Sequence, residues 1–379
     1  MLETLFSPEK IGNIQIKNRI VRSATFMGSC AKYGFISDKH IKIYDELAQG
    51  GSGLIISGFT AVDPGGSASP YQACLYDDSY IPGQKKLVEK VHEYSDVKIA
   101  AQIAHTGRQG YHPKFHPVAP SPIPFKLTGL TPREIKSEEI KDFIKKFVDT
   151  GYRAYICGYD FVQLHAAHGY FLSNFLSPFT NRRTDDYGGN SQNRVKILID
   201  IFNELRDKIG KNFPIIIKLQ VEDFIPNGLT LEEGVVYAKI LSEIGFDAIE
   251  PSGGGGDVQV QNKKPYPSLR CKTPEEENYF LPHVIKIKPL LKNCKLILMG
   301  GIRNPIFAEK ALNENIVNFI SMSRPLIYEP DLPNRWKGGD FSPAKCISCN
   351  GCYMTMRNGP VYCVTKSKIE KKKKSKNLI

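Results

Sequence analysis

Residues 160–170 read Asp160-Phe-Val-Gln-Leu-His165-Ala-Ala-His168-Gly-Tyr170. The apolar run that begins this stretch predicts a short buried strand, and the Gly-Tyr pair at its end predicts a loop. His165, His168 and Tyr170 therefore lie at the carboxyl end of a strand.

These two imidazoles and one phenol suit a particular chemistry. Both histidines can donate hydrogen bonds to one anionic oxygen while Tyr170 supplies a proton, as the reduction of a double bond conjugated to a carbonyl requires. A metal site is one alternative for His165 and His168, although zinc needs about three or four ligands and no nearby carboxylate clearly completes the set. Two ordinary loop histidines are the other alternative.

Seven further apolar runs alternate with helical patterns along the chain. The eight predicted strands cover residues 20–25, 53–59, 98–102, 160–164, 214–218, 247–251, 295–299 and 317–321, and helices are predicted, for example, over 137–151, 191–210, 230–245 and 304–313. Eight strand–helix repeats with nearly continuous apolar strands predict an α/β fold of the (β/α)8 TIM barrel type. A doubly wound sheet is the alternative, but no Gly-x-Gly-x-x-Gly motif follows a strand, which disfavours a dinucleotide-binding fold.

Two segments do not fit a bare repeat. Residues 9–17 predict a small hairpin before the first strand, and the proline-rich segment 112–131 predicts a long irregular loop after the third. Loops of this length in a compact domain are usually functional, so we expect this one to lie over the catalytic face.

Charge is concentrated at one end of the chain. The formal net charge is +12, and residues 366–376 contribute seven lysines against Glu370, which is half of the excess. We predict that residues 366–379 form a solvated, disordered tail, with no nucleic-acid partner.

Residues 1–20 lack a continuous apolar core, and no apolar run approaches the ~20 residues of a membrane span, which predicts a cytoplasmic protein without a membrane partner. The oligomeric state stays open.

Several longer motifs resemble the Old Yellow Enzyme family of NADH:flavin oxidoreductases. They are Leu5-Phe-Ser-Pro-Glu-Lys-Ile-Gly-Asn13, Lys17-Asn-Arg-Ile-Val21, Asn181-Arg-Arg-Thr-Asp-Asp-Tyr-Gly-Gly189, Ser323-Arg-Pro325 and Pro330-Asp-Leu-Pro-Asn-Arg335. The resemblance implies an FMN-bearing barrel over residues 1–340 that uses NAD(P)H to reduce activated alkenes by hydride transfer from flavin N5. It also implies that His165 and His168 bind substrate and that Tyr170 is the proton donor. The charges of residues 181–189 are expected to lock a long loop rather than to touch substrate.

The resemblance also assigns FMN-binding residues to the strand ends. Gln102 offers an amide donor and acceptor to flavin N3-H and O2, and Lys218 places a positive charge beside N1 and O2. The family usually carries arginine at the position of Lys218, and the alternative for this lysine is a structural ion pair with Glu222 or Asp223. The complete predicted set is Ser23, Ala24, Thr25, Phe59, Gln102, Lys218, Gly300, Gly301, Ser323 and Arg324, of which the last four are expected at the phosphate.

Phe26 marks a departure from the family. Relatives often present threonine or cysteine to the flavin edge, where this chain has Phe26, with Thr25 one residue earlier. We expect Phe26 either to contact substrate or simply to pack.

The segment 341–365 carries the pattern Cys346-x2-Cys349-x2-Cys352-x10-Cys363. Four thiolates at close spacing suit an iron–sulfur cluster or zinc, because thiophilic metals favour sulfur. The pattern is similar to the cluster motif of 2,4-dienoyl-CoA reductase and enoate reductase, although its later gaps are shorter. Metal-free thiols are the alternative.

Two other activities compete with alkene reduction. An NADH oxidase or quinone reductase would use the same fold and cofactor, with the histidines only orienting the ligand. A (β/α)8 lyase without flavin would use Lys218 as a Schiff-base nucleophile. The expected partner is thus a small electrophilic alkene or a quinone.

Overall fold

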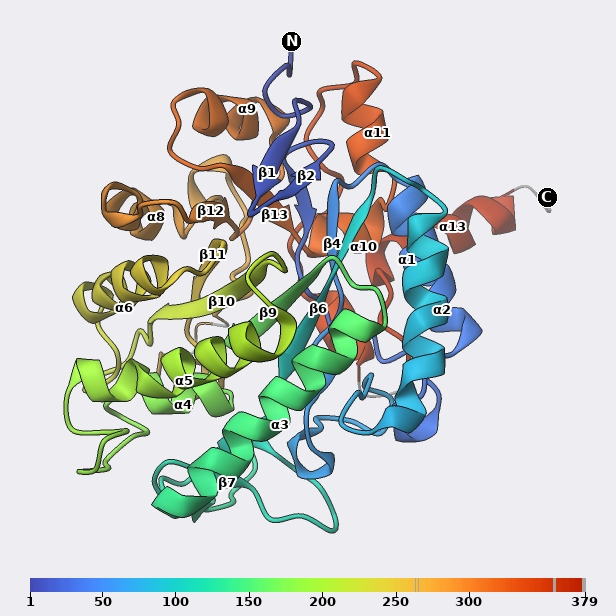
Figure 1. Cartoon of the computed structure of the whole chain (residues 1–379). Coiled ribbons are helices and arrows are strands. Elements are labelled where there is room, and N and C mark those ends of the chain that lie inside the picture. The colour runs from blue at the N-terminus through green and yellow to red at the C-terminus, as the bar shows by residue number, and fades with distance from the viewer. Residues whose placement is uncertain (263, 265, 357–358, 377–379) are drawn as a thin grey trace.

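The computed structural model describes residues 1–262, 264, 266–356 and 359–376 and contains eight parallel strands that close into a barrel (Figure 1). Neighbouring strands pair in chain order, and the last strand pairs with the first. The barrel strands are β3 (Ile20–Arg22), β4 (Leu54–Ile56), β6 (Lys98–Ala104), β9 (Phe161–Ala166), β10 (Ile215–Glu222), β11 (Ala248–Gly253), β12 (Lys295–Leu298) and β13 (Phe319–Met322), with the short β5 (Thr60–Ala61) beside β6. All eight predicted strands are present, so the predicted (β/α)8 barrel is confirmed.

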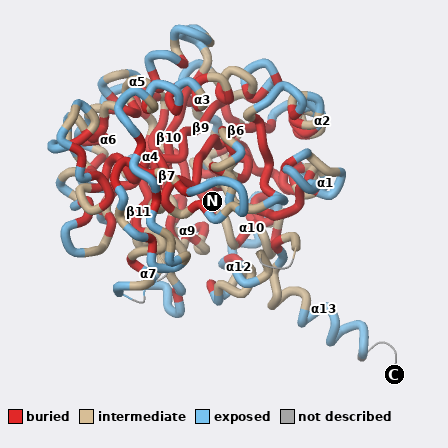
Figure 2. Tube along the Cα trace, turned by 90° about the horizontal axis from the view of Figure 1, so that it is seen from below, coloured by how far each residue is buried: buried red, intermediate tan, exposed pale blue. Residues whose placement is uncertain are grey.

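Helices surround the barrel, and Figure 2 shows the buried strands inside a ring of partly exposed helices. The surrounding helices are α1 (Asp38–Gln49), α2 (Ile81–His92), α3 (Ser137–Ile156), α5 (Ser191–Ile209), α6 (Leu231–Ile244), α8 (Leu281–Ile287), α9 (Pro305–Asn313), α10 (Arg324–Tyr328) and α11 (Leu332–Lys337). Two short helices, α4 (Phe171–Leu176) and α7 (Gly256–Asn262), follow β9 and β11. Short 3-10 turns cover Lys32–Gly34, Pro64–Gly66, Asp78–Tyr80, Gly107–Gln109, Pro274–Glu276 and Lys288–Leu290.

The ends of α6 show why the helix limits could be predicted. The Thr230 hydroxyl accepts a hydrogen bond from the Glu233 backbone N–H, and the Glu233 carboxylate accepts one from the Thr230 N–H. This reciprocal pairing satisfies two backbone donors that the first turn leaves free. Gly245 then ends the helix with a φ of 111°, which glycine adopts without a steric penalty.

The barrel interior is layered because successive side chains of a strand point alternately inward and outward. The layer nearest the amino ends of the strands is apolar, and the predicted hairpin, β1 (Glu9–Ile11) with β2 (Ile14–Ile16), packs Ile11 and Ile16 into it. The other members of this layer are Val21, Leu54, Ile56, Ala100, Phe161, Ile216, Ala248, Ile297 and Phe319.

The next inward layer, two residues further along the strands, is polar. Its buried members are Ser23, Gln102, Gln163, Lys218, Glu250 and Ser321. A lysine and a glutamate are therefore enclosed between an apolar floor and the open, carboxyl end of the barrel.

The irregular loop that follows β6 is fastened to the body of the protein. Within it, β7 (Val118–Ala119) pairs with β8 (Arg133–Glu134). The Arg183 guanidinium donates to the carbonyl oxygens of Pro120 at 3.3 Å and Ile135 at 2.6 Å, and it forms an ion pair with Asp185. The charges of residues 181–189 thus lock the loop, as predicted.

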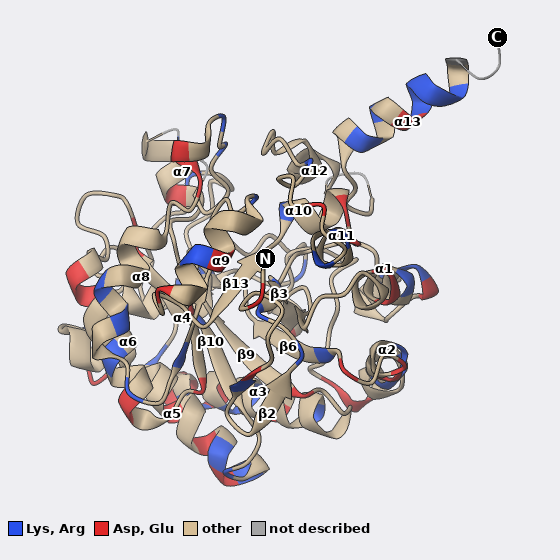
Figure 3. Ribbon diagram, turned by 90° about the horizontal axis from the view of Figure 1, so that it is seen from above, with Lys and Arg blue, Asp and Glu red and all other residues tan. Residues whose placement is uncertain are grey.

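The carboxyl-terminal segment differs from expectation. It contains α12 (Gly351–Thr355) and α13 (Val364–Lys376), and α13 projects away from the barrel with lysines along its length (Figure 3). Residues 366–376 are thus helical rather than disordered, which agrees with the high helix propensity of lysine and glutamate; the rest of the predicted disordered tail lies outside the described residues. In the part of the chain that the structure describes, no helix is long and apolar enough to cross a membrane.

We predict that Arg183→Ala lowers the free energy of unfolding by about 3 kcal/mol, because it leaves buried carbonyl oxygens without donors. Urea-induced unfolding measures the change. The matched control is Arg182→Ala, since Arg182 is exposed and should change stability by less than about 0.5 kcal/mol. Equal losses in the two variants would contradict the locking role of Arg183.

Candidate functional site

A buried ion pair forms the centre of the polar layer. The Lys218 ammonium lies 2.9 Å from Glu250 Oε2 and donates to the Ser23 hydroxyl at 2.9 Å. Strand register explains the contact, because Lys218 on β10 stands directly beside Glu250 on β11. The alternative ion pair with Glu222 or Asp223 is wrong, because strand register places Glu250 beside Lys218 and the lysine pairs with that carboxylate instead.

Glu250 is held from several strands. Its Oε1 accepts from the hydroxyls of Ser23 and Ser321, each at 2.8 Å, and its Oε2 accepts from the Gln163 amide at 3.0 Å as well as from Lys218. Burial alone would raise the pKa of Glu250, but the charge and hydrogen bond of Lys218 and the two serine hydroxyls hold that pKa below its usual value. The carboxylate is therefore ionised.

Gln102 joins the same network. Its amide nitrogen donates to Gln163 Oε1 at 2.7 Å, so a chain of hydrogen bonds runs from Gln102 through Gln163 to Glu250 and Lys218. The structure thus brings together two residues predicted at the flavin ring, Gln102 and Lys218, through two residues that sequence reasoning did not assign to the site.

His165 lies one inward layer closer to the mouth, on β9. Its side chain is buried, and its Nδ1 has no hydrogen-bond partner among the described residues. Burial and the positive charge of Lys218 lower the pKa of His165 to about 3. His165 is therefore a neutral imidazole at physiological pH.

His168 is fixed by both its backbone and its ring. Its φ of 66° is unusual for a residue with a side chain, and such strain is typical of functional sites. The His168 N–H donates to Gln220 Oε1 at 2.7 Å, and its ring Nε2 lies 2.7 Å from the Ser252 hydroxyl. Burial, together with His165 and Lys218, holds the pKa of His168 well below its usual value, so this imidazole is also neutral.

Tyr170 completes the predicted trio. Its ring centroid lies 5.1 Å from that of His165, whose own centroid is 5.0 Å from that of His168. Burial, with a contribution from the neighbouring Tyr353, raises the pKa of the Tyr170 phenol above its usual value. The phenol therefore keeps its proton at neutral pH and can act as a proton donor.

An aromatic wall extends from Tyr170. The Phe59 ring centroid lies 5.3 Å from that of Tyr170 and 5.7 Å from that of Phe26. Phe26 thus packs on Phe59 beside the predicted catalytic residues. The Thr25 hydroxyl is 2.7 Å from the Ser323 hydroxyl, while Ala24 packs against the apolar layer.

Gly300 and Gly301 follow β12 with φ values of 111° and 83°. A Cβ atom at Gly300 would stand 2.9 Å from the Phe280 ring, and one at Gly301 would stand 2.8 Å from the Cys271 sulfur. Only glycine fits at these two positions, which lie at the end of the strand before β13 and α10.

Arg324 turns toward the cysteine segment. Its guanidinium donates to Asn350 Oδ1 at 2.5 Å and to the Ser348 carbonyl oxygen at 3.5 Å. Arg324 therefore connects the end of β13 to the segment that carries the four cysteines.

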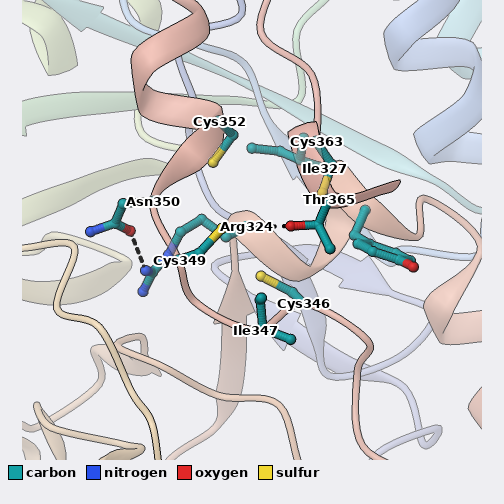
Figure 4. A pocket seen from close by; sticks show the side chains of 10 residues that line it. Arg324, Ile327, Cys346, Ile347, Cys349, Asn350, Cys352, Cys363 and Thr365 are labelled. Atoms are coloured by element: carbon teal, nitrogen blue, oxygen red, sulfur yellow. Dashed lines mark hydrogen bonds between the residues drawn. The ribbon is translucent and has the colours of Figure 1, made fainter. Parts of the chain in front are cut away.

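The four predicted cysteines line one pocket together with Arg324 (Figure 4). Burial raises the pKa of Cys346 to about 11, and it also raises the pKa of Cys352. For Cys349, the Gly351 N–H and the Thr365 hydroxyl outweigh burial and lower the thiol pKa. In the described part of the chain, no three His, Cys, Asp or Glu side chains are arranged to hold a metal ion, at this pocket or at the two mouth histidines.

Arg22, which sequence reasoning missed, is buried near the same segment. Its guanidinium donates to the Ser323 carbonyl oxygen and lies 3.6 Å from the Met27 sulfur. Burial lowers its pKa to about 10, with Tyr44 and Cys352 acting in the opposite direction. No described carboxylate pairs with it, which is unusual for a buried charge.

A sequence signal existed for two of the missed residues. Arg22 and Glu250 are charged residues inside otherwise apolar strand patterns, where charges are rarely buried without a role. Gln163 and Ser321 carry no comparable signal, because polar uncharged residues are common inside barrels.

The chain matches the model of the NADH:flavin oxidoreductase / NADH oxidase family over residues 4–340. It is 38% identical over 354 residues to an NADH oxidase of Thermoanaerobacter brockii, covering 92% of this chain and 53% of that protein. The chain therefore spans about half the length of this relative.

Two solved structures share the fold. A 2-naphthoyl-CoA reductase in complex with 2-naphthoyl-CoA superposes with a TM-score of 0.87 at 28% identity, covering 96% of this chain and 57% of that one. An Old Yellow Enzyme homologue from Zymomonas mobilis superposes with a TM-score of 0.74 at 26% identity, covering 90% of this chain and 94% of that one. The resemblance noted in the sequence is thereby confirmed, and the chain belongs to the NADH:flavin oxidoreductase / NADH oxidase family.

Proposed function

We propose that this protein is an FMN-dependent oxidoreductase that uses NAD(P)H to reduce carbon–carbon double bonds conjugated to a carbonyl group. The observation that carries the proposal is the cluster of two neutral imidazoles and one protonated phenol at the mouth of the barrel, directly above a buried lysine. The related 2-naphthoyl-CoA reductase was solved in complex with 2-naphthoyl-CoA, a thioester whose carbonyl is conjugated to an aromatic ring.

The described residues fit FMN. Gln102 and Lys218 offer an amide and a positive charge to the polar edge of the ring, and Gly300 and Gly301 have no side chains of their own to cover backbone N–H groups that would bind the phosphate. We assign FMN binding to the predicted set, Ser23, Ala24, Thr25, Phe59, Gln102, Lys218, Gly300, Gly301, Ser323 and Arg324. Bound FMN would accept hydride from NAD(P)H and deliver it to the β-carbon of the alkene.

His165 and His168 would hold the substrate carbonyl oxygen. As neutral rings they donate hydrogen bonds without adding positive charge, and these bonds strengthen as negative charge grows on the oxygen. Tyr170 would then transfer its proton to the α-carbon and recover a proton from solvent. Phe26 and Phe59 would line the substrate site.

One alternative has a specific observation in its favour. The Thermoanaerobacter brockii relative is named an NADH oxidase, and oxygen or a quinone would accept electrons without protonation of carbon. A Schiff-base lyase is disfavoured, because its lysine must lose a proton while the ion pair with Glu250 stabilises the charged ammonium.

We also propose that the cysteine quartet binds an iron–sulfur cluster, with zinc or free thiols as the alternatives. The support is the convergence of four thiols on one pocket beside Arg324, with the guanidinium of Arg22, which no described carboxylate neutralises, close to Cys352. A cluster held by four thiolates is anionic and would supply the counter-charge that this buried arginine lacks.

The first prediction from this proposal concerns Tyr170. In Tyr170→Phe, reduction of bound FMN by NADH should proceed at the wild-type rate, whereas reoxidation by 2-cyclohexenone should slow by about 100-fold, since the proton donor is lost. Stopped-flow absorbance of each half-reaction gives the two rates. Reoxidation by a quinone is the control and should be unaffected. A wild-type rate with the enone would remove Tyr170 from the mechanism, and a purified protein without flavin would refute the proposed function.

The second prediction concerns acid stability. The folded-state pKa of His165 is lowered from 6.5 to about 3, so the unfolded chain binds more protons than the folded chain between these values. The contribution of neutral His165 to stability is complete above pH 6.5 and is lost as pH falls toward 3. Each pH unit in this window should cost about 1.4 kcal/mol.

The variant His165→Asn tests this, because asparagine keeps a polar amide but does not titrate. Between pH 7 and pH 4.5, the wild-type protein should lose roughly 2–3 kcal/mol more unfolding free energy than the variant. Urea titrations at both pH values measure the difference. Parallel pH profiles would show that His165 is not buried as a neutral ring.

The third prediction concerns metal content. Protein purified without oxygen should contain iron and acid-labile sulfide, and Cys352→Ser should lose most of both, because one ligand of four is removed. Cys157→Ser is the matched control, since Cys157 is a buried thiol far along the chain from the quartet. Zinc in place of iron would identify the alternative centre, and protein free of both metals would leave the quartet as thiols.

A further inference from the structure

We infer that Glu250 is a positioning residue that holds the Lys218 ammonium beside the flavin and lowers the reduction potential of bound FMN. This inference rests on the proposed function, because it requires FMN above the polar layer. It assigns a role to a residue of the polar layer. This residue contacts neither substrate nor the reacting carbon atoms.

Lys218 requires such a partner because of its chemistry. The lysine side chain has four rotatable bonds and ends in a point charge, whereas arginine, usual at this position in the family, has a planar fork that binds two acceptors in fixed geometry. Glu250 and the Ser23 hydroxyl, each 2.9 Å from the ammonium, restrict it from two sides. The Met299 sulfur, at 3.8 Å, lies on a further side.

Glu250 can act as an anchor because it is itself fixed. Its side chain is completely buried, with 0% exposure, and both carboxylate oxygens have two hydrogen-bond donors. Three of these donors, Gln163, Lys218 and Ser321, come from the barrel strands β9, β10 and β13, and the fourth, Ser23, directly follows β3. Because donors from several strands fix the Glu250 carboxylate, it cannot move with the lysine side chain. The ion pair therefore restricts the position of the Lys218 ammonium.

The pair also changes the electrostatics of the site. Reduction of a flavin places negative charge near N1 and O2, which a lone ammonium would stabilise strongly in a buried site. The ionised Glu250 offsets part of that stabilisation, because it is buried next to the same ammonium. Reduced flavin is therefore less stabilised, and it remains a stronger hydride donor than it would be above an unpaired lysine.

The hydrogen-bond chain extends this influence across the ring. Gln102, proposed at flavin N3-H and O2, donates to Gln163, which in turn donates to Glu250. Donation to Gln163 orients the Gln102 amide, so its carbonyl oxygen stays available to accept from N3-H. Glu250 thus fixes both groups that face the polar edge of the flavin.

The test is the midpoint potential of FMN-loaded protein, measured by anaerobic spectroelectrochemical titration. Glu250→Gln keeps the shape of the side chain and removes its charge, so the potential should rise. At the wild-type midpoint, the ratio of reduced to oxidised flavin should increase by tenfold or more, which corresponds to about 30 mV for a two-electron couple. Lys218→Gln should shift the potential in the opposite direction.

The controls separate this role from a structural one. Ser321→Ala removes one hydrogen bond from the same carboxylate without changing charge, and it should move the potential by much less than Glu250→Gln. An unchanged potential in Glu250→Gln, or shifts of the same sign in both charge variants, would overturn the inference. Should Glu250→Gln not fold, Glu250→Asp decides, because it keeps the charge but draws the carboxylate back from the ammonium by one carbon: a raised potential supports the inference, and an unchanged one overturns it. Failure of the proposed function is distinguishable, because the wild-type protein would then carry no FMN, or would carry FMN but fail to reduce the enone, and neither result depends on the potential of Glu250→Gln.

Discussion

Closure of the barrel is the constraint on which the rest of the structure depends. Eight parallel strands in a ring leave every second side chain pointing into a shared interior, so residues two apart on each strand fall into successive layers. The layer that begins with Val21 and Phe161 is apolar, and the next, with Ser23 and Gln163, is polar. The position of a residue along its strand therefore decides whether it supports the barrel or serves the site.

The buried cations Lys218 and Arg22 differ in how their positive charge is neutralised. Lys218 is neutralised within its own layer by Glu250, so the ion pair is complete in the chain itself. Arg22 points out of the barrel, toward Met27 and the cysteine segment, and has no described carboxylate beside it. A protein can retain such a charge where a bound anionic group neutralises it, as the iron–sulfur cluster proposed at the four cysteines would do.

The elements that the sequence predicts well are those decided by neighbours along the chain. The eight strands follow from local apolar runs, and the limits of α6 follow from Thr230, Glu233 and Gly245 within that helix. The partner of Lys218 could not be found in this way, because Glu250 stands beside it only through the register of β10 against β11. The helix after Cys363 was missed for another reason: its lysines indicate a solvated segment but also favour helix, and composition alone does not decide between the two.

In the proposed function, the charged pair and the proton donor lie at different levels of the site. The lysine–glutamate pair lies below, where it is held from four sides, while His165, His168 and Tyr170 lie above it and are uncharged. Burial is the main reason that both histidines are neutral, and the positive charge of Lys218 in the layer below contributes to it. Tyr170, the proposed proton donor, is the N-cap residue of α4 and lies outside the barrel strands. Burial raises its pKa, with a contribution from Tyr353 of the cysteine segment, so its environment depends on segments outside the barrel. The barrel strands thus hold the charged pair, whereas the environment of Tyr170 also depends on α4 and on the cysteine segment.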